Sequence, residues 1–248
     1  MTESHPDNTQ TADRYILYED SDIIAVNKPA GMLAQKDSTG RQSLISIVSD
    51  YLKGEEHDSV PPYCAALHRL DRPVSGIMLF AKTPMAAGRL SDDIRYRKIK
   101  KFYCAITDSV PETGSADHWT ELRQYMVRRR DRGYIVSAEE PGASEVSLNY
   151  RLFPQETGSP LLLVELITGK RHQIRVQLSS LCSPVYGDRF YGSSIKNDDA
   201  IFLHAHCLSF THPSTGLQVN ISAPLPFYME ERLSSIPVPD DYLNCSIL

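Results

Sequence analysis

The chain has 248 residues, of which 41% are hydrophobic and 23% charged, and its formal net charge is −5. This length allows one large or two small domains, and the composition is ordinary for a water-soluble globular protein. No apolar run approaches the roughly 20 residues that a bilayer-spanning helix needs. The polar, acidic N-terminus also lacks the basic and apolar regions of a signal peptide, so we expect a cytoplasmic protein.

The hydrophobic pattern predicts several elements before residue 100. They are a disordered tail (1–13), two strands of a hairpin (15–18 and 23–26), an amphipathic helix (44–52), a loop (55–62), a buried strand (76–82) and a helix with Pro84 in its first turn (84–99). A Pro-Ala-Gly turn follows the hairpin at residues 29–31.

The second part of the chain continues with more strands than helices. The predicted elements are a strand (100–107), about 30 polar and basic residues without an assigned element, two strands (145–153 and 161–167), a helix (171–181), a hairpin (200–224) and a C-terminal tail (236–248). Because several neighbouring strands are joined as hairpins, we expect one α+β domain over residues 14–235. Its central sheet should be mixed and largely antiparallel, with flanking helices.

The five cysteines are scattered and never form a C-x-x-C pair: they are Cys64, Cys104, Cys182, Cys207 and Cys245. An odd number without metal-ligand spacing argues against a disulfide framework or a zinc knuckle. We therefore expect buried free thiols in a reducing compartment.

Basic residues are concentrated in three parts of the chain. The window from Arg69 to Lys101 holds nine basic and three acidic residues, a net charge of +6. The other two clusters are "RRRDR" at 128–132 and "GKRHQIR", which ends at Arg175. A single basic cluster is a solvated surface about as often as it is a binding site. Three of them favour a phosphate-binding surface despite the negative total charge.

One motif places charges directly before a buried strand. In "LHRLDRPVSGIMLFAKT", Asp71 lies between Arg69 and Arg72 and is followed by Pro73 and Gly76, which predict a rigid turn. A turn-capping or salt-bridged aspartate is the structural interpretation. The functional interpretation is a carboxylate that acts as a nucleophile or base.

Two further residues are candidates for the same site. Alternation along "KKFYCAI" puts Tyr103 on the opposite face from Phe102 and Cys104, and a strand tyrosine is usually a core residue with a solvated hydroxyl. Arg175 lies near the start of a predicted helix, where an anion binds readily, although a surface arginine is the simpler interpretation.

The histidines do not predict a metal site. His204 and His206 share a strand face and His212 lies at the hairpin turn, but no cysteine or carboxylate completes the set at a recognisable spacing. The chain also lacks the glycine-rich motifs of nucleotide cofactors and the G-x-S-x-G motif of serine hydrolases. We expect neither a metal nor a cofactor.

Five blocks of the chain, in order, resemble the signature sequences of RluA-type pseudouridine synthases. They are "ILYEDSDIIAVNKPAGML", "HRLDRPVSGIMLFAKT", "KKFYCAI", "ELITGKRHQIRVQLSSLCSPVYGDRFYG" and "LHAHCLSFTHP". Five blocks in register, from about Arg14 to Tyr228, are far more specific than any one of them. Val74 departs from the pattern, since threonine is more usual there.

The resemblance implies a cofactor-independent isomerase that acts as a monomer on a flipped uridine of ribosomal or transfer RNA. It implies that Asp71 is the nucleophile, attacking either sugar or base, and that Arg175 pairs with it. Tyr103 would pack against the flipped base and help to remove its C5 proton. The implied RNA contacts are Arg69, Arg72, Lys101, Arg128, Arg129, Arg130, Lys170, Arg171, His172 and Gln173.

Many members of the family carry an N-terminal S4 RNA-binding domain, whereas the expected catalytic domain begins here near residue 14. We therefore expect the catalytic domain alone to hold the RNA, using the basic insert at 128–132.

Two other functions fit parts of the pattern. One is a catalytically inactive RNA-binding module or RNA chaperone of the same fold. The other is an aspartate-dependent hydrolase of nucleosides or glycosides. A retaining glycosidase needs a second carboxylate about 5–5.5 Å from the first, and the blocks show no obvious partner acid.

Overall fold

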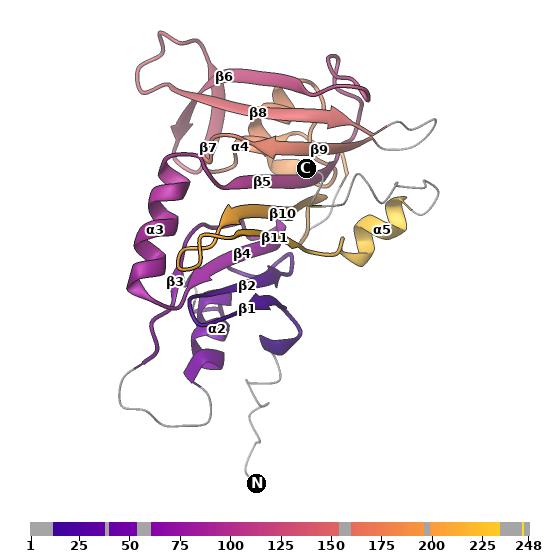
Figure 1. Cartoon of the computed structure of the whole chain (residues 1–248). Coiled ribbons are helices and arrows are strands. Elements are labelled where there is room, and N and C mark those ends of the chain that lie inside the picture. The colour runs from indigo at the N-terminus through magenta and orange to yellow at the C-terminus, as the bar shows by residue number, and fades with distance from the viewer. Residues whose placement is uncertain are drawn as a thin grey trace.

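The computed structural model describes residues 12–37, 40–53, 61–153, 160–195, 199–233 and 245. Figure 1 shows one long twisted sheet with helices packed on it. Its strands are β1 (Ile16–Glu19), β2 (Ile23–Lys28), β3 (Ala65–Ala66), β4 (Ser75–Ala81), β5 (Lys100–Ile106), β6 (Thr120–Arg129), β7 (Arg132–Val136), β8 (Ser144–Leu152), β9 (Leu161–Leu166), β10 (Leu203–Thr211) and β11 (Gln218–Ser222). The helices are α2 (Leu44–Lys53), α3 (Pro84–Arg95), α4 (Gln173–Ser180) and α5 (Phe227–Leu233), with a 3-10 turn η1 (Arg189–Tyr191).

The sheet is mixed, as the sequence predicts. Its order is β1-β2-β4-β10-β5-β9-β8-β6-β7, with β11 paired to β10 and β3 paired to β4. The β4–β10 pair is parallel, and the other pairs between the named strands are antiparallel. The predicted α+β class is therefore confirmed, and the parallel pair brings the motif before β4 beside the C-terminal hairpin.

Strand β4 is buried along its whole length, and all of its residues after Ser75 except Gly76 carry apolar side chains, because helices cover both faces of the sheet at that point. Met78 and Phe80 pack in the core under α2 and α4, whereas Ile77 and Leu79 pack in the core under α3. A third core, under α5, contains Phe102 of β5. The Asp71 turn thus leads into the most buried strand of the fold, which gives it a rigid base.

Gly76 is needed where β4 meets β10. It pairs with Ala205 and has a φ of 115°, a conformation that residues with a Cβ rarely adopt. A Cβ atom at this position would lie 2.5 Å from the backbone nitrogen of Ala205. The glycine of the H-R-L-D block therefore permits the parallel strand pair.

Helix α3 begins as predicted but ends earlier. The side chain of Thr83 accepts a hydrogen bond from the Ala86 amide, and Pro84 occupies the first turn. The prediction extended the helix to residue 99, whereas it ends at Arg95 and Arg97 has a positive φ of 58°.

The sequence prediction missed β6, β7 and α5, as well as the short strand β3 and the turn η1. Strands β6 and β7 form a hairpin within the stretch that was left unassigned, and α5 follows the last hairpin. Most residues of β6 are half-buried or exposed, so its hydrophobic alternation is weak. Figure 1 shows this hairpin at the end of the sheet, beyond the main core.

The prediction of free, buried thiols is confirmed in full only for Cys104 and is wrong for Cys182, Cys207 and Cys245. Cys207 on β10 and Cys245 form a disulfide with a Cα–Cα distance of 5.7 Å, and the free Cys182 is exposed. Cys104 is free and buried, and Cys64 is free and half-buried. The pair spans 38 residues, so only the folded chain brings its members together.

Parts of other predictions fall outside the described residues: 1–11 of the tail, 55–60 of the loop and most of the C-terminal tail. Ala12, which the prediction placed in the tail, is buried. In the part of the chain that the structure describes, no helix is long and apolar enough to cross a membrane.

Candidate active site

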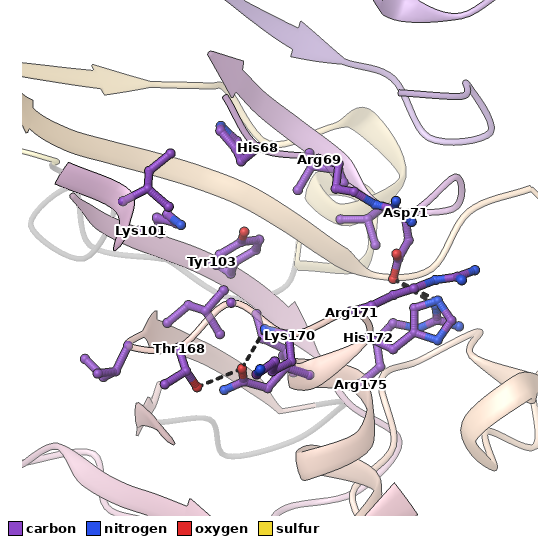
Figure 2. A pocket seen from close by; sticks show the side chains of 18 of the residues that line it. His68, Arg69, Asp71, Lys101, Tyr103, Thr168, Lys170, Arg171, His172 and Arg175 are labelled. Atoms are coloured by element: carbon purple, nitrogen blue, oxygen red, sulfur yellow. Dashed lines mark hydrogen bonds and ion pairs between the residues drawn. The ribbon is translucent and has the colours of Figure 1, made fainter. Parts of the chain in front are cut away.

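An arginine joins two carboxylates at the centre of the candidate site. Nη1 of Arg175, on α4, donates to Oδ2 of Asp71 at 3.0 Å, and its Nε and Nη2 donate to Asp188 at 2.6 and 2.9 Å. Asp188 is 2% exposed at its side chain, Arg175 6% and Asp71 16%. The predicted contact between Asp71 and Arg175 is present, and Figure 2 shows both side chains at one end of the cavity.

Sequence reasoning missed Asp188. It is the aspartate of the "GDRFYG" stretch, and no partner for it could be assigned from the sequence. Its carboxylate is fully occupied by the Arg175 guanidinium, a bidentate geometry that fixes the arginine in one plane. Asp188 therefore orients Arg175 and does not line the cavity as a second catalytic acid.

His172 makes a second contact with Asp71. Its Nε2 lies 3.4 Å from Oδ2 of Asp71, and its Nδ1 lies 2.8 Å from the hydroxyl of Tyr191. That hydroxyl accepts a hydrogen bond from the Gly133 amide at 3.0 Å, so its own proton is available to Nδ1. Burial lowers the pKa of His172 to about 4, which makes the ring neutral at pH 7 with its proton on Nε2, facing Asp71.

The backbone at His172 is unusual. Its φ of 62° is in the left-handed region, where a residue with a side chain is rarely found, and α4 begins at the next residue. Such conformations persist where the surroundings hold them. Here the Tyr191 hydroxyl and Asp71 hold the ring on both sides.

Lys28 was also missed by sequence reasoning. Its side chain is fully buried at the end of β2, and its Nζ donates to the carbonyls of Pro29, Met32 and Arg72 at 3.0, 2.9 and 3.1 Å. Burial lowers its pKa to about 7, and the charge of Asp71 opposes that effect. Lys28 ties the Pro-Ala-Gly turn to the Asp71 turn, and a lysine that ends an apolar strand is the signal that could have found it.

Tyr103 lies on β5 in the wall of the cavity, as its predicted face requires (Figure 2). It is 6% exposed and belongs to the core under α2 and α4. Burial and the charge of Asp71 raise its pKa, so the side chain is a neutral phenol at pH 7.

The cavity has a volume of about 680 Å³, within the range of small-ligand sites. Its lining includes eight arginine and lysine residues: Arg69, Arg95, Arg97, Lys101, Arg128, Lys170, Arg171 and Arg175. Asp71 and Glu145 are the acids of the lining. The site thus combines one carboxylate, one aromatic ring and an excess of positive charge.

The predicted RNA contacts fall into three groups. Arg69, Lys101, Arg128, Lys170, Arg171, His172 and Gln173 line the cavity. Arg72 pairs with Asp199 at 3.6 Å, Arg129 pairs with Glu140, and Arg130 is exposed at the tip of the β6–β7 hairpin.

Gln173 differs from the other predicted contacts. It is 2% exposed, and its amide oxygen accepts from Thr168 and Lys170 while its nitrogen donates to Ser147 and Gln177. Its hydrogen-bonding groups are used within the protein, where they shape the turn before α4.

One cluster in the described residues has the spacing of metal ligands, and it is Asp20, Asp22 and His212. His212 Nε2 lies 2.8 Å from Asp20 Oδ2, and the other Asp20 oxygen accepts the amides of Asp22 and Ile23. These bonds pin the β1–β2 turn to the end of β10.

Comparison with known proteins identifies the family of this fold and site. The family model for RNA pseudouridylate synthase matches residues 22–180. The chain is 30% identical to the ribosomal large subunit pseudouridine synthase D of Xylella fastidiosa, covering 89% of this chain and 69% of that protein. It is 29% identical to the tRNA pseudouridine synthase C of Haemophilus ducreyi, covering 84% and 89%.

The human RNA pseudouridylate synthase domain containing 4 has the same fold, with a TM-score of 0.74 and 23% identity over 91% of this chain and 94% of that one. The chain belongs to the RNA pseudouridylate synthase family. It is an RNA pseudouridine synthase, an isomerase that converts uridine to pseudouridine within RNA, and the predicted enzyme is favoured over an inactive binding module.

Proposed function

We propose that the enzyme acts on uridines of ribosomal or transfer RNA and that Asp71 is its nucleophile. By their names, one of the relatives described above acts on ribosomal RNA and the other acts on transfer RNA. The observation that carries the role of Asp71 is its position: a carboxylate in the cavity wall, held by Arg175 at 3.0 Å and faced by the neutral His172 ring.

The reaction breaks the N1–C1′ bond and forms a C5–C1′ bond, while C5 loses a proton and N1 gains one. No electrons are gained or lost, so the carboxylate needs only to form and release a covalent bond to the sugar or the base. Arg175 balances the charge of that carboxylate and fixes its orientation.

Tyr103 packs against the flipped base in this proposal. Because burial raises its pKa, the phenol is protonated at pH 7 and is poorly suited to take the C5 proton. This argues for the stacking role over the base role that the resemblance also implied. We expect Tyr103→Phe to retain most activity, and Tyr103→Ala to lose it.

The RNA backbone lies against the cations that line the cavity, and the β6–β7 hairpin extends this surface. Arg171 lies 3.6 Å from Asp131 at the hairpin tip, and the Gly133 amide bonds to Tyr191, so the hairpin is joined to the site. In this proposal one catalytic domain, residues 14–235, acts as a monomer in the cytoplasm, where both RNA classes are found.

The test is tritium release from ribosomal and transfer RNA that carries [5-³H]uridine, since pseudouridine formation must expel the C5 hydrogen. The wild type and an Asp199→Asn control should release tritium, because Asp199 is an exposed carboxylate paired with Arg72. Asp71→Ala and Asp71→Asn should release none. Release by either Asp71 variant at the wild-type rate would exclude Asp71 as the nucleophile.

A further inference from the structure

A second cavity also borders Asp71. Its volume is about 460 Å³, and it shares Arg69, Leu70, Asp71, Arg171, His172 and Arg175 with the first cavity. The shared residues line both spaces, and Figure 2 shows five of them, Arg69, Asp71, Arg171, His172 and Arg175, grouped at one end of the first cavity. A ligand held at Asp71 in one cavity therefore lies directly beside the other.

The lining of the second cavity combines an aromatic ring, aliphatic groups, five cations and three acids, Asp37, Asp71 and Asp131. Phe190 of η1 is 46% exposed there, and Leu33 and Pro73 add apolar surface. Lys36 and Arg72 belong to its lining in addition to the shared arginines. An exposed phenylalanine beside cations is suited to a base and its phosphate, because every base can stack on an aromatic face.

Phe190 is held in place from two sides. Its ring meets His172 edge-on, with ring centroids 5.9 Å apart and an interplanar angle of 83°. The guanidinium of Arg132, on β7, lies 5.3 Å from the ring centroid, and that of Arg175 lies 5.9 Å away. The ring is thus oriented by the residues that hold Asp71, while nearly half of its surface is left to solvent.

We propose that this second cavity binds the nucleobase adjacent to the reacting uridine, with Phe190 as its stacking surface. The inference rests on the proposed RNA function and extends it to a second subsite. It makes Phe190 a determinant of substrate binding and gives the enzyme contact with a nucleotide outside the reaction centre.

The test uses a stem-loop RNA that carries a uridine modified by the wild type. It is made with natural neighbours and with an abasic residue at either adjacent position, and kcat and KM are measured by tritium release. On the natural RNA, Phe190→Ala should lower kcat/KM about 10- to 100-fold, chiefly through KM, and Phe190→Trp should restore it. Phe227→Ala is the matched control, since Phe227 is 76% exposed on α5 and does not line either cavity.

The abasic RNAs separate stacking from a purely structural effect. If Phe190 stacks on the neighbouring base, one abasic RNA should weaken the wild type by a similar factor and should weaken Phe190→Ala no further. Equal losses for the two proteins on every abasic RNA would overturn the proposal, as would wild-type kcat/KM for Phe190→Ala. If the wild type modifies no stem-loop taken from ribosomal or transfer RNA, the RNA target proposed above is refuted instead.

Discussion

Asp188→Asn tests whether the buried carboxylate holds Arg175, the arginine that pairs with Asp71. The change preserves the shape of the side chain but removes its charge, and it leaves one acceptor for the two nitrogens at 2.6 and 2.9 Å. Hydrogen bonds to charged groups contribute about 1.5–3 kcal/mol, and breaking a buried ion pair costs about 3–5 kcal/mol. Asp71 still pairs with Arg175, so we expect a loss of about 3 kcal/mol in the free energy of unfolding.

For a chain of this length, that loss corresponds to a fall in Tm of roughly 6–12 °C, which circular dichroism measures directly. Single-turnover tritium release, measured well below the Tm of the variant, should slow by about 10-fold or more because Arg175 is less well oriented. The matched control is Asp199→Asn, which removes a carboxylate that is 82% exposed and 3.6 Å from Arg72. Exposed pairs contribute about 0–1 kcal/mol, so its Tm should change by no more than about 2–4 °C.

Two outcomes would refute this reasoning. If Asp188→Asn melts at the same temperature as the control, the buried pair does not stabilise the fold. If it melts lower but reacts at the wild-type rate, Asp188 stabilises the protein without orienting Arg175.

Three further predictions concern the frame around the site. Gly76→Ala should abolish soluble expression or lower the Tm by more than 10 °C. The control Gly88→Ala in α3, where no atom lies within 4 Å of the added Cβ, should leave the Tm unchanged or raise it slightly. Equal Tm values for the two variants would contradict the close approach of Gly76 to Ala205. Lys28→Met should lower the free energy of unfolding by about 2–3 kcal/mol, because three carbonyls lose their donor. It should also slow tritium release, because the Asp71 turn is held less firmly. Urea unfolding measures the stability, and an unchanged value would show that these hydrogen bonds are not needed. Burial lowers the pKa of His172 to about 4 and that of His204 to about 3, so between pH 6.5 and 4 the unfolded chain binds more protons than the folded one. The contribution of these two histidines to stability should therefore be complete above about pH 6.5 and should fall as the pH drops towards 4. A Tm that is constant between pH 6.5 and 4 would contradict the buried, neutral histidines.

Helices α2, α3 and α4 and the better buried strands could be predicted because their cause is local. Strand β4 carries a continuous apolar run after Gly76 since both of its faces are covered, and the Thr83-Pro84 pair marks the start of α3. The β6–β7 hairpin could not be predicted in this way, because it lies at the edge of the sheet and alternates only weakly. Its pairing depends on β8, which follows it in the chain.

The candidate site divides in a similar manner. Asp71, Tyr103 and Arg175 could be predicted because each lies in a motif that resembles a known family, and strand alternation placed Tyr103 on the correct face. Lys28 and Asp188 could not, because each acts through a residue that is distant in sequence: Lys28 donates to Arg72 as well as to the nearby Pro29 and Met32, and Asp188 accepts from Arg175.

By itself, the sequence determined the fold class, the family and the identity of the candidate nucleophile, because these follow from local patterns and from the order of the motifs. Only the tertiary structure decided which buried charges support Asp71, that Gln173 bonds inward while Phe190 remains exposed, and that Cys207 meets Cys245. The physical reason is that burial, charge pairing and pKa depend on groups brought together across the sheet, and chain distance does not encode those contacts.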